Sequence, residues 1–572
     1  MTSLASTLTN IVGSAFEKAG LPADLGLVRV SDRPDLCQFQ CNGAMAAAKV
    51  AKKNPRAIAE EIVEMLSGHD EFSKVEIAGP GFINLDVTDE FLTKFSAGIA
   101  DDDSYGIKKA DKNQTIVLDY GGPNIAKPMH VGHLRASIIG DALRRIFLFA
   151  GYKALGDVHM GDWGLPMGQI ITELEERGIL GQPVTMEDLE EIYPTASKAC
   201  KENEERMEKA RAATVKLQDG DPEYTKVWQQ FIDVSIAGMK KNFDNLGVHF
   251  DLWKGEACVH NLIAPMVEKL KSQGLAVESD GALVVNVAQE DDKKEIPPLI
   301  LYKRDGAVMY GTTDMATIVD RVQLYDDLLK IVYIVDQRQS LHFEQVFRAV
   351  RLGNIAPQTV ELIHAGFGTM NGADGKPFKT RAGGVMKLED LIAMGVEKAQ
   401  ARLAEAELGE DYSEDERNDI AHKVAIAAIK FADLQNNRIA DYVFDLDRMT
   451  SFEGKTGPYL LYQAVRIKSL LRKAGGSDYK ITEIGEGEKA LALQLAELPD
   501  HFENALKYYT PHVLCDYAYK LAQTFSSFYG NCHILSETDQ NIRSSRLALC
   551  SLTYRQLEVV LSMLGIEIPE RM

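Results

Sequence analysis

Hydrophobic residues recur with two different periods along this chain, and the change from one period to the other predicts its elements. The β-branched run from Thr115 to Leu118 predicts a strand, and a turn rich in Gly, Pro and Asn follows it. Apolar residues then recur at helical spacing from Leu134 to Ile146. This stretch therefore predicts a strand, a tight loop and a helix.

The same patterns divide the chain into three regions. Residues 1–108 mix helical and strand patterns around a Gly-Pro-Gly turn, which predicts a small α/β domain. Strands and helices alternate over 109–393, as in a Rossmann-like, doubly wound parallel sheet, and a polar helical insertion is expected at about 174–296. Residues 394–572 have an almost wholly helical pattern, so we expect a multidomain α/β plus α protein ending in a helical bundle.

Composition favours a protein of a reducing compartment. Hydrophobic residues make up 45% of the 572 residues, and no apolar run approaches the ~20 residues that span a bilayer. The first residues lack both a charged leader and an Arg-rich presequence. Seven cysteines, an odd number, are scattered from Cys37 to Cys550 and indicate no disulfide framework. We expect a cytoplasmic protein that has no membrane partner.

Net charge alone argues against nucleic-acid binding, because it is −21. Charge acts locally, however, since screening limits its range to about 10 Å. One stretch is basic and contains a single acidic residue, Asp478. Its basic residues are Lys455, Arg466, Lys468, Arg472, Lys473 and Lys480. If the protein binds RNA, this stretch is where phosphates are expected.

Two histidines, His130 and His133, stand where the first helix of the sheet domain begins. A helix N-terminus attracts phosphate, and imidazoles there can donate hydrogen bonds to phosphate oxygens as charge develops. Gly132 between them lets a flat ligand approach the backbone. A pair of histidines alone is also typical of surface residues or half of a metal site. No Cys or His pair with ligand spacing stands nearby, so no structural metal is expected.

A second candidate phosphate loop occupies 376–385, between a predicted strand and a predicted helix that begins at Leu388. Lys379, Thr380 and Arg381 lie in this Gly-containing loop, which could close over a triphosphate. On its own the segment would be read as an ordinary basic turn.

Together these segments resemble the class I aminoacyl-tRNA synthetases, and the arginyl-tRNA synthetases in particular. His130-Val131-Gly132-His133 matches the His-x-Gly-His signature, and its flanks match on both sides. The loop matches the mobile Lys-Met-Ser-Lys-Ser loop, with Arg381 in place of the second lysine. The resemblance implies that His130, His133, Lys379 and Arg381 are catalytic. We add Lys127, in the turn before His130, because Arg381 is a less compact charge than the lysine it replaces. It implies ATP contacts at His130, Gly132, His133, Gly366, Phe367, Lys379 and Thr380.

The remaining polar positions suit a guanidinium ligand, which needs planar carboxylates for paired hydrogen bonds. Asp119 ends the first strand, at the edge where open sheets bind ligands. Tyr310 and Asp314 are one helical turn apart. The resemblance implies an arginine pocket of Asp119, Asn124, Tyr310, Asp314 and Gln339, and we expect His342, three residues after Gln339, to join it. Each of these residues alone could equally be a helix cap or a surface group.

The helical third carries aromatic and basic residues on one face of a helix that begins near Pro458. Aromatic rings among cations suit unstacked single-stranded bases, although half-buried tyrosines between helices would give the same pattern. The segment resembles the anticodon-binding domain of the family. The resemblance implies tRNA contacts at Tyr459, Tyr462, Arg466 and Lys473, and at Phe82 and Asn84 for the D-loop.

The resemblance covers essentially the whole chain and implies a two-step reaction. ATP, with Mg²⁺ shielding its phosphates, and L-arginine give arginyl-adenylate and pyrophosphate; a terminal ribose hydroxyl of tRNA(Arg) then takes the arginyl group. A monomer is expected. Two other readings stay open at this point: a smaller nucleotidyltransferase of the same fold, and a tRNA-binding paralogue without activity.

Overall fold

The computed structural model describes residues 2–110, 113–372, 374–376, 378, 386–409, 411–476 and 478–572. The chain forms two compact units: residues 1–110, 452–562 and 567–572 make the first, and 111–451 with 563–566 make the second. Among the described helices, none has both the length and the apolar character needed to cross a bilayer.

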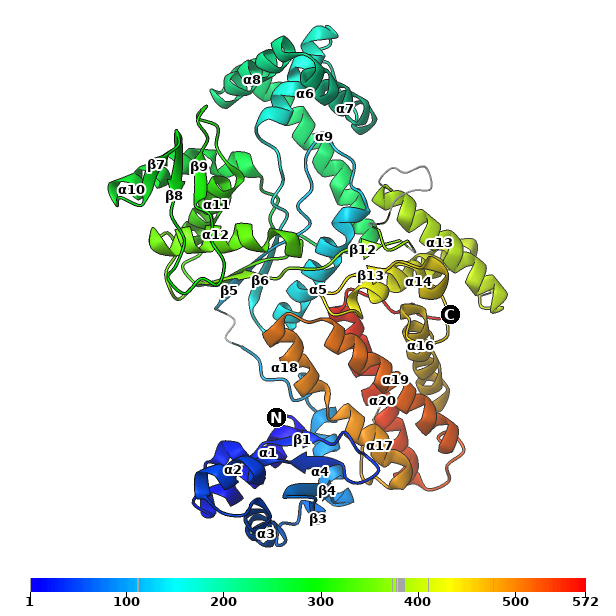
Figure 1. Ribbon diagram of the computed structural model, residues 1–572. Helices are drawn as coiled ribbons and strands as arrows, with labels where there is room; N and C mark the ends of the chain where they lie inside the picture. The colour runs from blue at the N-terminus through cyan, green and yellow to red at the C-terminus, as the bar shows by residue number, and fades with distance from the viewer. Residues whose placement is uncertain are drawn as a thin grey trace. The chain divides into compact units, whose positions relative to one another are not determined.

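A four-stranded parallel sheet forms the centre of the second unit (Figure 1). Its strands are β5 (Thr115–Asp119), β6 (Lys153–Asp157), β10 (Leu328–Tyr333) and β11 (Glu361–His364), in the order β11-β10-β5-β6. β6, the next strand in sequence, lies on one side of β5 in the sheet, whereas β10 and β11 lie on the other side. The order therefore reverses between β5 and β10, and such a reversal opens a crevice at the carboxyl ends of the two strands.

Helices connect the strands and cover the sheet. α5 (Leu134–Ala150) joins β5 to β6, and α12 (Ser340–Leu352) joins β10 to β11. A second layer packs around β10 and includes a small antiparallel sheet of order β7-β8-β9. Its elements are α10 (His260–Ser272), β7 (Ala276–Ser279), β8 (Ala282–Val285), β9 (Leu299–Tyr302) and α11 (Tyr310–Leu324). The shared apolar core of these elements fixes α11 beside the sheet.

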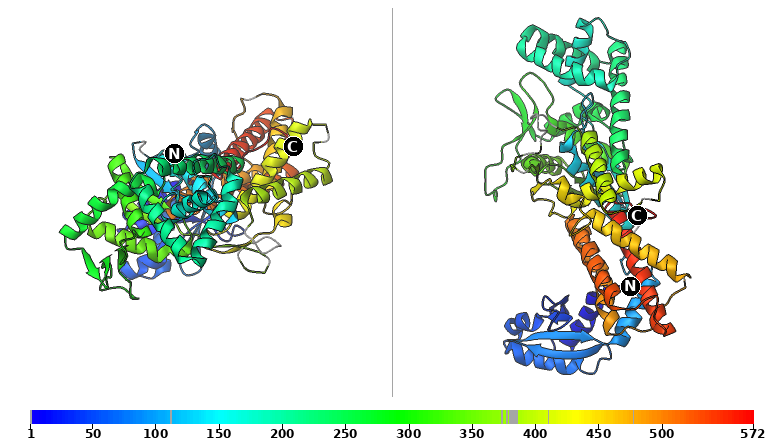
Figure 2. Two further views of the ribbon diagram at one scale, coloured as in Figure 1. Left: turned by 90° about the horizontal axis from the view of Figure 1, so that it is seen from above. Right: turned by 90° about the vertical axis from the view of Figure 1, so that its right-hand side faces the viewer.

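The polar stretch between β6 and this layer is helical. Its helices pack on one another (Figure 1 and Figure 2) and are α6 (Leu165–Glu176), α7 (Met186–Glu202), α8 (Glu204–Gln218) and α9 (Pro222–Leu246). Thr185 and Asp188 close the first turn of α7 with reciprocal side-chain to backbone hydrogen bonds. The unit continues with β12 (Met370–Asn371), α13 (Leu388–Glu405), α14 (Glu414–Leu434), β13 (Tyr442–Val443) and α15 (Leu446–Met449).

The first unit joins a small α/β domain to a helical bundle. The domain has an antiparallel sheet of order β1-β2-β4-β3, in which the Gly79-Pro80-Gly81 turn connects β3 to β4. Its elements are α1 (Leu4–Lys18), β1 (Val28–Val30), β2 (Phe39–Cys41), α2 (Gly43–Ala51), α3 (Pro55–Leu66), β3 (Phe72–Ala78), β4 (Phe82–Val87) and α4 (Asp89–Ala100). The bundle comprises α16 (Gly457–Ala474), α17 (Glu486–Leu495), α18 (Leu498–Tyr508), α19 (His512–Asn531) and α20 (Gln540–Met563). The predicted α/β plus α fold class is confirmed.

Candidate active site

The two histidines of the signature stand at the turn that leads into α5, after the carboxyl end of β5. His130 caps a short 3-10 turn, Val131–His133, and its Nδ1 accepts the N–H of Gly132 at 3.0 Å. His133 Nδ1 accepts the N–H of His130 at 3.2 Å, and the two ring centroids are 4.1 Å apart. Because each Nδ1 accepts a backbone proton, the neutral ring keeps its own proton on Nε2. Both Nε2–H groups are thus left to donate.

Both imidazoles are held neutral at physiological pH. Burial lowers the pKa of His133 to about 3, helped by the neighbouring His130. Burial also lowers the pKa of His130, and the positive charge of Lys127 adds to the effect. Gly132 is required between the rings, because a Cβ there would lie 2.7 Å from the His130 ring. The pair is a neutral donor pair suited to phosphate oxygens.

The candidate phosphate loop is anchored beside these histidines. Val131 N–H donates to Met386 O at 3.0 Å, and Leu388 N–H donates to Met129 O at 3.1 Å. On the other side, Phe378 N–H donates to Met370 O at 3.1 Å. Lys379, Thr380 and Arg381 themselves lie outside the described residues. The flank that follows them therefore runs along the His130 segment.

Lys127 is half-buried three residues before His130, and the insertion contacts it. Its amine lies 4.5 Å from the ring centroid of Tyr193 on α7. The same helix contacts the end of the phosphate loop, because Glu190 accepts from the Lys387 amine at 2.7 Å. α7 thus contacts both basic segments that border the histidine pair.

Gly366 and Phe367 follow β11, at the same edge of the sheet. Phe367 N–H donates to Val335 O at 3.2 Å, and Phe367 O accepts the N–H of Gln337 at 2.9 Å. A side chain at Gly366 would collide with the Gln337 amide, 2.1 Å from a Cβ. The turn after β11 is therefore held tightly against the turn after β10.

The expected arginine-binding residues come from several strand ends. Asp119 is buried at the end of β5, and its Oδ2 accepts from Arg321 at 2.6 Å. Asn124 forms an isolated bridge with Gly161, where a Cβ would lie 2.1 Å from the Asn124 Oδ1. Because Gly161 has no side chain, the amide of Asn124 can pack against the loop that follows β6.

The other four lie on α11 and α12 or just before them. Asp314 Oδ2 and His342 Nε2 are 2.5 Å apart, which joins the first turns of α11 and α12. Tyr310 begins α11 and is 73% exposed, and Gln339 is exposed in the turn before α12. The structure therefore brings Asp314 to His342, while Tyr310 and Gln339 present their side chains to solvent.

The sequence reasoning missed several polar residues in this crevice. Asp157 ends β6 beside Asp119, and Arg321 bridges the two carboxylates with one nitrogen, at 2.6 Å and 2.7 Å. His159 Nε2 lies 3.2 Å from the Thr317 hydroxyl of α11. Two signals were available. Asp157 ends a strand as Asp119 does, and Arg321 lies seven residues after Asp314, on the same helix face.

Matches to known proteins cover the whole chain. Residues 95–446 match the family described as tRNA synthetases class I (R), catalytic domain. Residues 3–87 match the arginyl tRNA synthetase N-terminal domain, and 460–572 match the DALR anticodon binding domain. The arginine–tRNA ligase of Hyphomonas neptunium is 51% identical and that of Maricaulis maris 50% identical, each over 100% of both chains. This chain belongs to the arginyl-tRNA synthetases.

Solved structures of the family have the same fold. The arginyl-tRNA synthetase of Plasmodium falciparum superimposes with a TM-score of 0.85 at 27% identity, covering 100% of both chains. The resemblance drawn from the signature and the phosphate loop is thereby confirmed. The chain is an arginine–tRNA ligase of class I, and this family uses ATP. A smaller nucleotidyltransferase is excluded, because the matched N-terminal and anticodon-binding domains flank the catalytic domain.

In the anticodon-binding domain of this family member, α16 presents the expected aromatic and basic face. The Tyr459 and Tyr519 rings meet edge to face at 5.7 Å, and the Arg466 guanidinium lies 4.2 Å from the Tyr529 ring centroid. Tyr462 is 39% exposed, and Lys473 is also exposed. α19 therefore adds two tyrosines to this face that the sequence reasoning did not include.

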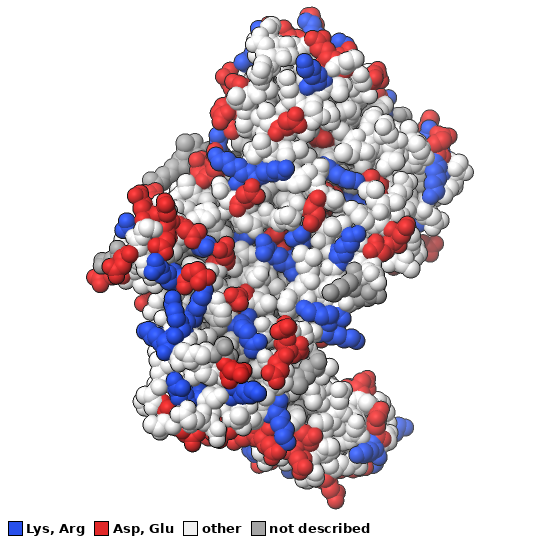
Figure 3. Space-filling model, turned by 180° about the vertical axis from the view of Figure 1, so that it is seen from behind, with Lys and Arg blue, Asp and Glu red and all other residues white. Residues whose placement is uncertain are grey.

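Two other lysines of the basic stretch form ion pairs with acidic residues. Lys455 pairs with Asp516 at 2.5 Å and Lys468 with Glu570 at 2.6 Å. Figure 3 likewise shows Lys and Arg interspersed with Asp and Glu over one face of the molecule. The local excess of positive charge is thus smaller than the sequence indicates.

The two expected contacts in the N-terminal domain lie on β4. Phe82 is half-buried at its start. Asn84 is buried, and its Oδ1 accepts from Gln40 Nε2 at 2.8 Å. Phe82 is therefore the more accessible of the two.

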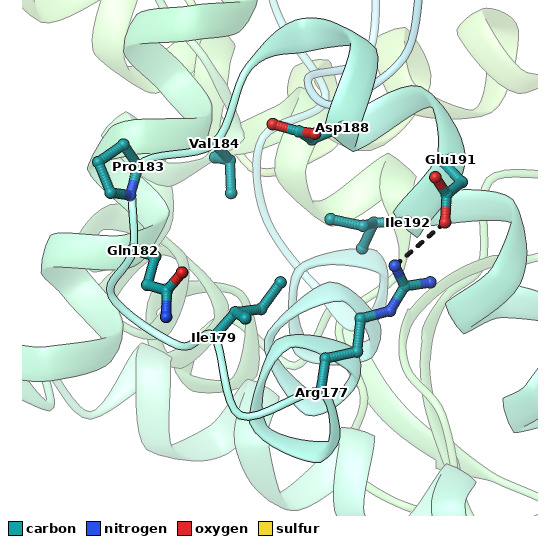
Figure 4. A pocket seen from close by; sticks show the side chains of 8 residues that line it. All are labelled: Arg177, Ile179, Gln182, Pro183, Val184, Asp188, Glu191 and Ile192. Carbon is teal, nitrogen blue, oxygen red and sulfur yellow. Dashed lines mark hydrogen bonds and ion pairs between the residues drawn. The ribbon is translucent and has the colours of Figure 1, made fainter.

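A small pocket lies in the insertion (Figure 4). Arg177 and Glu191 pair across it at 3.1 Å, and Ile179, Val184 and Ile192 supply apolar walls. None of the expected site residues that the structure describes lines this pocket.

Proposed function

We propose that this chain joins L-arginine to tRNA(Arg) in two steps. The arginine carboxylate attacks the α-phosphate of ATP, which gives arginyl-adenylate and pyrophosphate. A hydroxyl of the terminal tRNA ribose then attacks the activated carbonyl and releases AMP. The observation that carries this proposal is that Asp119, at the end of β5 where the strand order reverses, and Asp314, on α11, lie in the same unit as the neutral histidines.

The arginine side chain is assigned to the acidic end of the crevice. Asp119 and Asp314 offer planar carboxylates to the guanidinium, and His342 orients the second of them. Asn124 holds the α-carboxylate or the α-amine. Tyr310 and Gln339 then cover the substrate from the start of α11 and the turn before α12.

ATP is assigned to the opposite end, next to the histidines. His130 and His133 donate from Nε2 to phosphate oxygens, and Gly132 admits the adenine. Gly366 and Phe367 border the nucleotide from the turn after β11. Lys379, Thr380 and Arg381 close over the phosphates, and Mg²⁺ arrives with ATP, because phosphate oxygens are its ligands. The protein's part is placement and charge stabilisation, with no protein nucleophile.

The third substrate, tRNA, is assigned to the first unit. Tyr459, Tyr462, Arg466 and Lys473 contact the anticodon, and Phe82 and Asn84 contact the D-loop. We further infer a monomer working in the cytoplasm. In support, the proposed catalytic positions lie in one unit of one chain, and all seven cysteines are free thiols. Sedimentation at micromolar concentration gives the mass of the species that is active.

Arg466→Ala is expected to raise the apparent KM for tRNA and to lower the salt dependence of tRNA binding by about one charge. The reason is that the guanidinium supplies one phosphate or base contact, held in place by the Tyr529 ring. Filter binding across a salt series measures the slope. Lys468→Ala is the matched control on the same helix, because its amine already pairs with Glu570. An unchanged tRNA KM in Arg466→Ala would assign this face to packing alone.

The KM for arginine is expected to fall about three- to tenfold as pH rises from 6 to 8. Burial, with the charges of Asp162 and Asp314, raises the pKa of Glu256 to about 7. Below that pKa Glu256 is neutral, and above it Glu256 adds a negative charge close to Asp314, which we assign to the guanidinium, so binding strengthens as pH rises. Exchange kinetics at several pH values measure the effect. Glu256→Gln should flatten the dependence of the arginine KM on pH. A pH dependence unchanged by that substitution would show that Glu256 does not affect arginine binding.

The experiment that tests the proposed function is charging of tRNA with labelled arginine. The expected products are arginyl-tRNA, AMP and pyrophosphate, whereas formation of ADP would contradict adenylate chemistry. Periodate-oxidised tRNA lacks the terminal diol and is the control that blocks the second step only.

A further inference from the structure

Arg321 is the centre of a buried cluster of charged residues, and the proposed contact of Asp119 with arginine does not explain why this cation is there. Arg321 lies two turns beyond Asp314 on α11, and only 1% of its side chain is exposed. One terminal nitrogen of its guanidinium donates to both Asp119 Oδ2 and Asp157 Oδ2. The guanidinium also lies 5.3 Å from the ring centroid of Tyr333 on β10. Three strands and one helix thus meet at a single internal cation.

Arg321 alone does not balance the charges of the two carboxylates. Asp119 and Asp157 carry two negative charges when ionised, and Arg321 supplies one positive charge, because a guanidinium stays protonated. A cationic substrate side chain would supply the missing charge. Other titratable groups nearby are His159 after β6, Tyr333 on β10, Asp314 and Asp320 on α11, Tyr325 after α11 and Asp251 after α9. Lys254 pairs with Asp320, and Lys153 lies over the Tyr325 ring.

Several buried polar atoms of the cluster lack a hydrogen-bond partner among the described residues. They are Asp157 Oδ1, His159 Nδ1, Arg321 Nε, Arg321 Nη1 and the Tyr333 hydroxyl. Unpaired groups of this kind are costly in a folded core. Asp157 and Tyr333 end strands of the sheet at the edge where open sheets of this kind bind ligands.

We propose that Arg321, anchored by Asp157, is a positioning residue for arginine recognition: it holds Asp119 by one oxygen and keeps it ionised, so that the other oxygen meets the substrate guanidinium. This inference rests on the proposed function, since it takes Asp119 as an arginine contact. It adds two residues, Arg321 and Asp157, to the determinants of substrate affinity.

The physical reason is electrostatic. Without Arg321, the Asp119 and Asp157 carboxylates would face each other in a buried crevice, and two adjacent carboxylates cannot both ionise easily there. One of them would keep a proton near neutral pH. Burial already raises the pKa of Asp119, and Arg321 opposes that rise. Losing the cation therefore converts a charged acceptor into a neutral group at the pH where the enzyme works.

The test measures KM for arginine and for ATP in exchange assays from pH 6 to 8.5. Arg321→Met is expected to raise the arginine KM at pH 7 by about tenfold or more. The ratio of this KM to that of the unmodified enzyme should fall as pH rises, because the pair of carboxylates then loses its proton. The ATP KM should stay within about twofold. Arg321→Lys keeps the charge and should recover most of the affinity.

Asp157→Asn separates positioning from general structural damage. With Asp157 neutral, Arg321 neutralises Asp119 alone, so the arginine KM should rise about tenfold without a new pH dependence. Arg348→Met is the matched control, because it removes a second arginine that pairs with Asp292 and Glu344. Its arginine KM should follow the unmodified profile.

Two outcomes would overturn the proposal. One is an arginine KM and a pH profile that are the same in Arg321→Met and Asp157→Asn as in the unmodified enzyme. The other is a lower arginine KM in Arg321→Met, which would mean that Arg321 competes with the substrate for the carboxylates. If Arg321→Met does not fold, Asp157→Asn and Arg321→Lys decide the matter. Failure of the proposed function itself is distinguishable, because the unmodified enzyme would then show no arginine-dependent exchange.

Discussion

Lys127→Ala is expected to lower kcat for adenylate formation by about 10²–10³-fold, the usual loss for one oriented electrostatic group. Arg381 stands where other class I enzymes have a second loop lysine, and a guanidinium is a less compact charge. Lys127 lies three residues before His130, in the turn that leads to the proposed α-phosphate site. We therefore expect its amine to neutralise charge that develops in the transition state. Arginine KM should change little, because the ground state hardly uses this contact.

Pre-steady-state adenylate formation measures this effect without interference from product release. Lys153→Ala is the matched control. The Lys153 amine also lies over a tyrosine ring, 5.4 Å from the ring centroid of Tyr325, but Lys153 begins β6 and so lies at the end of that strand opposite Asp157. A near-normal kcat in Lys127→Ala would transfer the role to Lys379 or Arg381. Tyr193→Leu should release the Lys127 amine from its aromatic contact while leaving its charge in place.

Asp314→Asn is expected to lower kcat/KM for arginine by about 10²–10³-fold. The substitution keeps the shape of the side chain and removes its charge, so the guanidinium is left with one carboxylate, Asp119. It also weakens the contact with His342, which fixes the orientation of Asp314. Exchange kinetics with arginine varied at saturating ATP give the ratio.

Asp320→Asn is the matched control on the same helix. Asp320 pairs with Lys254 at 2.5 Å and is not assigned to the pocket. Its kcat/KM for arginine should stay within about threefold of the unmodified enzyme. Equal losses in both variants would indicate damage to α11, and an intact ratio in Asp314→Asn would remove Asp314 from the pocket.

The sequence predicts elements well where local pattern decides them. The run after Thr115 forms β5, the helix expected from Leu388 begins there, and Pro458 opens α16 as expected. Local breaks also decide where helices end: α2 and α3 are separate helices, because Lys52 takes a left-handed conformation and Pro55 begins the second helix.

Contacts between distant segments could not be predicted in the same way. Arg321 meets Asp119 and Asp157 only because β5, β6 and α11 pack side by side. The contact of Lys127 with Tyr193 depends on where the insertion folds back on the sheet domain. The acidic partners of the basic stretch are equally remote in sequence, since Asp516 lies on α19 and Glu570 after α20. Local periodicity contains no information about such pairs.

The most direct test of arginine activation is ATP–pyrophosphate exchange with each of the twenty amino acids, with and without total tRNA. We expect exchange with arginine when tRNA(Arg) is present, and much weaker exchange with lysine, whose ammonium cannot fill a planar pair of carboxylates. We also expect that exchange requires the RNA. Rates for lysine or glutamine comparable to that for arginine would contradict the arginine assignment, and full exchange without RNA would contradict the requirement for tRNA.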